Sequence, residues 1–133
     1  MPELPEVETT LKAIKSFEKE VLNSISIHNP NLRWLVDNDI NKKIAGKRIK
    51  QIFRRAKYLI FDFNDYQLIV HLGMSGTLRI INKKDNFFKK HDHAELTFSK
   101  NKLIYNDPRR FGSIHVTKDC LLYTSDAADE LCR

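Results

Sequence analysis

The stretch Tyr58-Leu-Ile-Phe-Asp-Phe-Asn-Asp-Tyr-Gln-Leu-Ile-Val-His-Leu72 decides the fold. Residues 58–63 are rich in aromatic and β-branched side chains, and residues 67–72 return with a similar composition after the turn pair Asn64-Asp65. Two such runs separated by a short turn predict a β-hairpin. The fold is therefore expected to be built on antiparallel strands.

Short β-rich or alternating runs repeat before and after this hairpin. They predict further strands at residues 24–28, 48–54, 77–81, 93–98, 103–106 and 113–116. Turn-forming residues lie at 82–85, 99–101 and 106–108. Closely spaced short strands predict a mainly β protein, an antiparallel sandwich or barrel with flanking helices.

An amphipathic helix is expected over residues 5–20. Pro5 suits a first helical turn, and Glu6 and Glu8 suit the positive end of the helix dipole. Apolar residues then recur every three or four positions, at Val7, Leu11, Ile14, Phe17 and Val21. A second, shorter helix is expected over residues 39–45.

The charge of the chain favours a polyanionic partner without requiring one. The 133 residues include 23 Lys and Arg against 17 Asp and Glu, a net charge of +6. Many basic proteins bind no nucleic acid, so charge alone leaves both possibilities open. No run approaches the ~20 apolar residues of a membrane span, and no apolar signal segment follows Met1, so a cytoplasmic location is expected.

Residues 119–133 differ in composition from the rest of the chain. They are acidic, contain alanines and hold both cysteines, Cys120 and Cys132. We interpret this segment as a non-native tail that resembles a translated sequencing adapter; a genuine acidic helix end is the alternative. The absence of cysteine from residues 1–118 argues against a disulfide framework or cysteine-bound zinc there. The assignment is one domain over residues 1–118, followed by the tail.

Pro2 is a candidate nucleophile. Removal of Met1 would leave its secondary amine at the N-terminus, with a pKa near the ~7.7–8.0 of α-amino groups, so part of it is unprotonated at neutral pH. Attack on a sugar C1′ and ring opening would give an iminium, which acidifies the C2′ hydrogens. Glu3 and Glu6 could act as a general acid and an orienting group. The alternatives are an ordinary Met-Pro start and ordinary helix-start acids.

Two glycine-containing loops, His71-Leu-Gly-Met-Ser-Gly76 and Asn106-Asp-Pro-Arg-Arg-Phe-Gly112, are candidates for a wedge. Met74 on the first loop and an Arg/Phe pair on the second could fill the space left by an extruded nucleotide. For an arbitrary aromatic residue, a place in the core is the more common role.

Two further clusters have both a functional and a structural interpretation. Arg54-Arg-Ala-Lys-Tyr58 is either a phosphate-binding hairpin tip, with Lys57 near the reacting sugar, or a solvated strand edge. His91 and His93 would share one face of a strand, as metal ligands do, but no third ligand is placed. No metal is therefore expected, and phosphate contact or core hydrogen bonding is preferred.

Together these segments resemble the formamidopyrimidine-DNA glycosylase family. Its motifs are matched in order and spacing by Met1-Pro-Glu-Leu-Pro-Glu-Val-Glu-Thr9, Arg54-Arg-Ala-Lys-Tyr58, His71-Leu-Gly-Met-Ser-Gly76, Lys90-His-Asp-His93 and Asp107-Pro-Arg-Arg-Phe-Gly112. The start of the chain, with leucine at position 4, resembles this branch of the family, because the sister endonuclease VIII branch typically has glycine there. The resemblance implies a two-layer antiparallel β-sandwich with flanking helices.

The resemblance also implies a role for each matching residue. Pro2 would be the Schiff-base nucleophile, Glu3 the proton donor for base release, and Glu6 a support for the damaged nucleotide. Lys57 would act in β-elimination and hold a phosphate. The residues that would contact DNA or fill the gap left by the flipped base are His71, Met74, His91, Arg109, Arg110 and Phe111.

The implied function is base-excision repair by a bifunctional DNA glycosylase and abasic-site lyase that removes oxidised purines, chiefly 8-oxoguanine and formamidopyrimidines. The implied partner is double-stranded DNA with such lesions or abasic sites, and the implied protein is a monomer of the bacterial cytosol or nucleoid. Family members continue into a helix–two-turn–helix domain and a Cys₄ zinc finger. Neither is found here, so we expect an incomplete fragment without a cofactor, the structural zinc belonging to the full-length family.

Two other functions remain as alternatives. One is a non-catalytic DNA-binding fragment, because half of the DNA clamp would be missing. The other is a basic β-protein that serves RNA or a protein partner, but the sequence lacks the aromatic runs of common RNA-binding modules.

Overall fold

The computed structural model describes residues 4–85 and 89–118. Pro2, Glu3 and the whole of the 119–133 segment lie outside the described residues. The helices are α1 (Leu4–Ile14), the 3₁₀ helix η1 (Lys15–Phe17) and α2 (Ile40–Ile44). The strands are β1 (Ser24–Ile27), β2 (Gln51–Arg55), β3 (Tyr58–Asp62), β4 (Tyr66–His71), β5 (Thr77–Asn82), β6 (Asp92–Thr97), β7 (Asn101–Asn106) and β8 (Ser113–Lys118).

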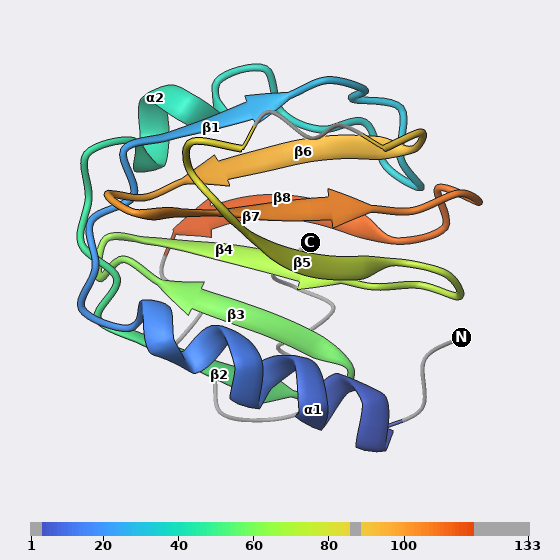
Figure 1. Cartoon of the computed structure of the whole chain (residues 1–133), viewed down its shortest axis with the longest axis horizontal. Coiled ribbons are helices and arrows are strands. Elements are labelled where there is room, and N and C mark those ends of the chain that lie inside the picture. The colour runs from blue at the N-terminus through green and yellow to red at the C-terminus, as the bar shows by residue number, and fades with distance from the viewer. Residues whose placement is uncertain (1–3, 86–88, 119–133) are drawn as a thin grey trace.

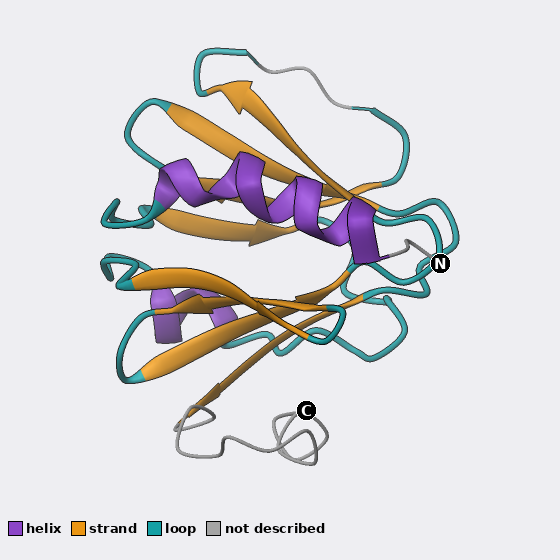
Figure 2. Ribbon diagram, turned by 90° about the horizontal axis from the view of Figure 1, so that it is seen from below, coloured by secondary structure: helices purple, strands orange, loops and turns teal. Residues whose placement is uncertain are grey.

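The strands form two four-stranded sheets, in the orders β1-β6-β7-β5 and β2-β3-β4-β8. Every pairing within them is antiparallel, and Figures 1 and 2 show the sheets as two layers. The central β3–β4 hairpin pairs Tyr58 with His71 and Asp62 with Gln67. The expected fold, a mainly β two-layer antiparallel sandwich with flanking helices, is confirmed.

The main core lies between the two sheets. Side chains alternate between the faces of a strand, and the inward Leu59 and Phe61 of β3 are completely buried. The outward Ile60 and Ile69 are also buried, beside Phe53. Burial on both faces explains why the central hairpin is a nearly continuous apolar run in the sequence.

The helices cover two edges of the sandwich. Helix α1 packs against β2 of one sheet and β5 of the other, and Figure 2 shows it lying along the side between the layers. Its buried residues Val7, Leu11 and Ile14 are part of the main core. Helix α2 packs against β1, where the side-chain oxygen of Asn41 accepts the backbone N–H of Ile25 at 2.9 Å. The expected short helix over residues 39–45 is confirmed.

The first helix is shorter than the predicted span of residues 5–20. The α-helix ends at Ile14, one 3₁₀ turn follows, and Lys19 has a positive φ of 73°. A competing backbone pairing explains this end. The N–H of Lys19 donates to the carbonyl of Ile49 at 2.8 Å, and the N–H of Ile49 donates to the carbonyl of Glu20 at 2.9 Å. The apolar spacing alone could not reveal this partner.

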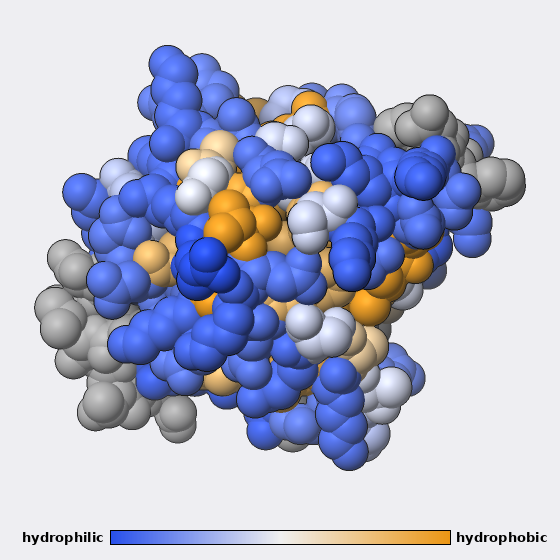
Figure 3. All heavy atoms as spheres, turned by 60° about the vertical axis from the view of Figure 1, so that its left-hand side comes forward, coloured by the Kyte–Doolittle hydropathy of each residue, from blue (hydrophilic) through white to orange (hydrophobic). Residues whose placement is uncertain are grey.

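The two ends of the sandwich differ in what they carry. Residues 56–57, 72–76 and 107–112 and the first turn of α1 lie at the right-hand end in Figure 1, which we term the loop end. The opposite end carries α2, and Figure 3, which brings that side forward, shows a largely hydrophilic surface with small apolar areas. Ion pairs there neutralise Lys43 with Asp37 at 2.7 Å and Lys47 with Asp65 at 2.5 Å. No helix in the described residues is long and apolar enough to cross a membrane.

Candidate functional site

The β2–β3 hairpin brings a basic tip to the loop end. Ala56 and Lys57 form its two-residue turn, and Ala56 has a positive φ of 53°, as tight hairpin turns often require. Arg54 is engaged internally: it pairs with Glu8 of α1, and its Nη1 donates to the Ala56 carbonyl at 2.7 Å. Arg54 therefore holds the hairpin against α1, while the half-buried Lys57 lies at the tip.

The loop that follows β4 presents a methionine to solvent. Met74 is 46% exposed, which excludes the core position that was its alternative. The backbone beside it is fixed, because the N–H of Gly73 donates to Nδ1 of His71 at 3.0 Å and the N–H of Gly76 donates to the Leu72 carbonyl at 2.7 Å. The His71 ring lies 5.0 Å from the ring of Tyr58, so the histidine is held between the hairpin and the loop.

The loop that follows β7 presents two arginines and an aromatic ring. Phe111 is 47% exposed, so it too lies outside the core. Arg109 and Arg110 are exposed, and neither forms an ion pair with any residue that the structure describes. Arg110 has a positive φ of 57°, so the chain turns sharply at this point. Two unneutralised guanidinium groups beside an exposed ring suit a polyanion with stacked bases.

Asp107, to which the sequence analysis gave no role, joins the two loops. Its side chain is completely buried. One carboxylate oxygen accepts the Ser75 hydroxyl at 2.7 Å and the Arg110 N–H at 3.1 Å; the other accepts the Tyr105 hydroxyl at 2.8 Å and the Gly112 N–H at 2.9 Å. Burial and the bond to Asp107 raise the pKa of Tyr105, so its hydroxyl stays protonated and donates.

His91 and His93 have different environments. His93 is buried, and its Nε2 donates to the Asp107 carbonyl at 2.7 Å, which is a core hydrogen bond. His91 is half-buried and has a positive φ of 71°. The two rings lie 6.3 Å apart. Within the described ranges no three His, Cys, Asp or Glu side chains lie close enough to hold a metal ion.

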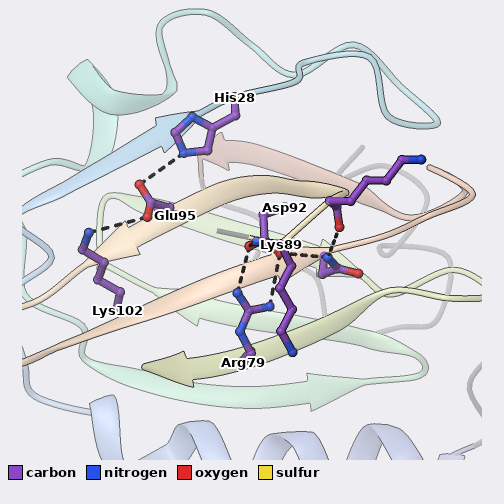
Figure 4. A network of polar contacts seen from close by, with 8 residues as sticks. His28, Arg79, Lys89, Asp92, Glu95 and Lys102 are labelled. Carbon is purple, nitrogen blue, oxygen red and sulfur yellow. Dashed lines mark hydrogen bonds and ion pairs between the residues drawn. The ribbon is translucent and has the colours of Figure 1, made fainter. Parts of the chain in front are cut away.

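A buried ion pair fixes the backbone beside His91. Asp92 takes a two-pronged contact from Arg79, at 3.2 and 2.8 Å, together with the N–H of Lys89 at 2.7 Å and the side-chain amide of Asn106 at 2.8 Å (Figure 4). Burial acts to raise the pKa of Asp92, but these hydrogen bonds and the positive charge of Arg79 outweigh it and lower the pKa below its ordinary 3.8. The turn that carries His91 is therefore anchored by Arg79.

Replacement of Arg79 by methionine is expected to lower the free energy of unfolding by about 2–3 kcal/mol at pH 7, because it leaves a buried carboxylate without its charged partner. A lowered folded-state pKa contributes stability above the unfolded value, and this contribution is lost as pH falls through the folded value. The difference between parent and variant should therefore shrink below about pH 4. Urea unfolding at pH 7 and pH 3 measures it.

Lys15→Met is the matched control, because Lys15 pairs with Glu18 at 3.9 Å in an exposed position. It should cost less than about 0.5 kcal/mol. An Arg79→Met loss that is equally large at both pH values would contradict the assignment to Asp92.

An exposed tryptophan near the second loop was also missed in the sequence. Trp34 is 55% exposed, with the guanidinium of Arg33 5.7 Å from its ring centroid. The N–H of Arg33 donates to the Gly112 carbonyl at 3.1 Å, which joins this segment to the loop end. A depression of about 540 Å³ lies between residues 31–33 and 109–111. An aromatic residue beside an arginine, outside any periodic pattern, was the available signal.

The structure brings most of the candidate residues to one end, and two of the candidates lie outside the described residues. Lys57, Met74 and the residues at 109–111 lie at the loop end, and the exposed Glu6 lies in the first turn of α1 at the same end. Pro2 and Glu3, directly before α1, are not described. The zinc implied by the resemblance finds no ligand set here, because no cysteine falls in residues 4–85 or 89–118.

Sequence comparison places residues 1–114 within the formamidopyrimidine-DNA glycosylase N-terminal domain family. The formamidopyrimidine-DNA glycosylase of Marinobacter nauticus is 44% identical over 128 residues, which cover 95% of this chain and 44% of that protein. That of Psychromonas ingrahamii is 49% identical over 118 residues, which cover 86% of this chain and 42% of that protein. The chain thus spans less than half the length of these relatives.

Comparison of structures also finds formamidopyrimidine-DNA glycosylases, again matched over most of this chain and less than half of theirs. Lactococcus lactis Fpg in complex with DNA containing FAPY-dG matches with a TM-score of 0.82 at 35% identity, over 90% of this chain and 46% of that one. The same protein in complex with DNA containing an abasic site matches with a TM-score of 0.81 at 34% identity, over 91% and 46% respectively.

Proposed function

The chain belongs to the formamidopyrimidine-DNA glycosylase family, and on this premise we propose that it is the nucleophile-bearing part of a base-excision DNA repair enzyme. The proposed reaction has two parts, the release of a damaged base and the cleavage of the strand at the resulting abasic site. The proposed substrates are duplex DNA with an oxidised purine, 8-oxoguanine or formamidopyrimidine, and duplex DNA with an abasic site. We place the enzyme in the bacterial cytosol or nucleoid, as a monomer.

One observation carries this proposal: the candidate DNA contacts gather at the end of the sandwich where α1 begins. Lys57 comes from the β2–β3 turn, Met74 from the loop after β4, and Arg109 from the loop after β7. These positions are separate in the sequence, and the antiparallel pairing of their strands brings them together. The two arginines without ion-pair partners in the described residues supply the positive charge that a DNA backbone requires.

The chemistry is assigned to the residues around the N-terminus. With Met1 removed, the Pro2 nitrogen attacks C1′ of the damaged nucleotide, and the base departs with a proton from Glu3. Ring opening gives an iminium that carries no N–H. Its fixed positive charge withdraws electrons from C2′, whose proton is lost as the 3′ phosphate departs. Lys57 holds a phosphate and assists this elimination, and Glu6 supports the nucleotide.

The remaining candidates are assigned to DNA binding. His71, His91 and Arg110 contact the DNA backbone, where each neutralised phosphate releases a counterion. Met74, Arg109 and Phe111 fill the space that the extruded nucleotide leaves and contact the orphaned base. The half-exposed state of Met74 and Phe111 supports this assignment, because insertion into a base stack requires accessible apolar side chains.

DNA binding without catalysis is a second candidate. The observation that favours it is the coverage of the relatives, 44% of the Marinobacter protein and 42% of the Psychromonas protein. Contacts made by the rest of those proteins would position the substrate, and a displacement of 1 Å can cost ~10²-fold in rate.

Borohydride trapping with the 133-residue chain separates the two candidates. An oligonucleotide duplex with one abasic site is expected to give a covalent adduct, and an intact duplex none. Binding to both should weaken as salt rises. Salt-sensitive binding without an adduct would support the second candidate. Absence of both binding and adduct would contradict the two together.

A further inference from the structure

Three segments that carry proposed DNA contacts meet at one buried residue, Asp107. The carboxylate accepts bonds from the first loop, through the Ser75 hydroxyl, and from the second loop, through the N–H groups of Arg110 and Gly112. The Asp107 backbone adds the third segment, because its N–H donates to the His91 carbonyl at 3.1 Å. Each of these hydrogen bonds joins Asp107 to a different group, so the bonds hold the three segments in parallel.

Ser75 makes the connection between the loops two-sided. Its hydroxyl donates to Asp107 at 2.7 Å and accepts the N–H of Arg109 at 3.2 Å. The residue directly before Ser75 is Met74, and Arg109 leads to Phe111. The side chains assigned to the gap in the duplex are therefore one or two residues from a shared hydrogen-bond network.

Backbone packing adds a second, independent connection. A Cβ at Gly73 would lie 2.5 Å from the N of Gly112 and 2.7 Å from the carbonyl carbon of Phe111. Real Cβ atoms do not approach other atoms so closely, so the two loops touch backbone to backbone. A displacement of one loop toward the other is blocked by this contact, and a displacement away from it is opposed by the Asp107 bonds.

We propose that Asp107 is a positioning residue that makes the two loops one rigid body, so that Met74 and Phe111 enter the DNA at a fixed mutual spacing. This inference rests on the proposed function for its role in DNA, but the coupling of the loops is a property of the free protein. An aspartate is suited to this position because four donors converge on two oxygens. In either orientation an asparagine would turn its NH₂ group toward one hydroxyl and one backbone N–H. The hydroxyl can rotate and accept, but the backbone N–H would lose this acceptor.

The first test measures amide hydrogen exchange in the free chain and its Asp107→Asn variant. The reporters are the amides of Gly73 and Gly76, which bond within their own loop and not to Asp107. We expect both to exchange at least about tenfold faster in the variant. Ser75→Ala is the second variant, to be used if Asp107→Asn fails to fold. It removes only the hydroxyl that bridges the two loops, and it should have the same effect on exchange. Unchanged exchange at both glycines would overturn the coupling, whatever the chain does with DNA.

The matched control is Asp62→Asn. Asp62 is also a buried carboxylate, and it accepts the side-chain amide of Gln67 at 3.2 Å and the N–H of Asn64 at 2.9 Å. It is the last residue of β3, at the opposite side of the sandwich from the loop end. It should lower stability without faster exchange at Gly73 or Gly76. A general loss of stability would instead raise exchange equally in both variants.

The second test concerns DNA and uses the rate of adduct formation on an abasic duplex divided by the rate on the same single strand. Asp107→Asn and Met74→Ala are each expected to lower this ratio about tenfold, and the double variant little further, because both changes disable one unit. Asp62→Asn should leave it within about twofold. An unchanged ratio in Asp107→Asn would overturn the role in DNA, while absence of any adduct from the parent chain would count against the proposed function and leave the exchange result to decide the coupling.

Discussion

Replacement of Pro2 by glycine is expected to reduce the borohydride-trapped adduct on abasic DNA about a hundredfold. Both residues would present an α-amino group of similar basicity once Met1 is removed, so the expected difference arises after attack on C1′. Proline gives an iminium with no proton on nitrogen, which keeps its positive charge until it is reduced, hydrolysed or the strand is cut. Glycine gives an imine that can lose its proton and become neutral, and a neutral imine accepts hydride from borohydride more slowly.

Pro5→Gly is the matched control for that result. Pro5 is an exposed proline in the first turn of α1, and its replacement changes the same kind of residue in the same segment. It should lower stability by about 1 kcal/mol or less and leave the adduct unchanged. Equal adduct from the parent and Pro2→Gly would contradict the expected need for a secondary amine at position 2. Intact-mass measurement completes the test, because a chain that retains Met1 has no free Pro2 amine and should form no adduct at that residue.

The strands could be predicted from the sequence because their signals are local. The turn pair Asn64-Asp65 and the β-rich runs around it locate β3 and β4 within a residue or two. The order of the strands in the sheets had no such signal. Ser24 pairs with Thr97, and Thr77 pairs with Asn106. These partners are far apart in the chain, and many strands of similar composition compete for them.

The part of the candidate site that could be predicted consists of single residues that differ from an ordinary core pattern. A residue whose role depends on hydrogen bonds to distant parts of the chain could not be predicted. Met74 and Phe111 lie in loops with glycines, which is a local signal, and both are half exposed. Asp107 lies before a proline, where an aspartate is common in turns, so its sequence position suggests nothing more. Its importance depends on Ser75 and Tyr105, which only the fold brings to it.

Replacement of Gly112 by alanine is expected to lower the free energy of unfolding by about 3 kcal/mol or more, with a fall in melting temperature of about 10 °C. The new Cβ would overlap the hydroxyl oxygen of Tyr105 and the carbonyl oxygen of His71. Neither can move freely, because the tyrosine is buried and bonded to Asp107 and the carbonyl belongs to the end of β4. Relief therefore requires displacement of the second loop.

Gly46→Ala separates this crowding from backbone strain. Gly46 has a positive φ of 80°, but a Cβ there would meet nothing within 4 Å. Its replacement should cost only the left-handed strain of an alanine, about 1–2 kcal/mol. Thermal and urea unfolding of the two variants measure the difference, and a Gly46→Ala loss equal to that of Gly112→Ala would contradict the packing argument. The clash in Gly112→Ala displaces the loop that carries Arg109 and Phe111, so Gly112→Ala should also form adduct with less preference for duplex over single-stranded DNA. Gly46→Ala, at the opposite end of the sandwich, should keep this preference.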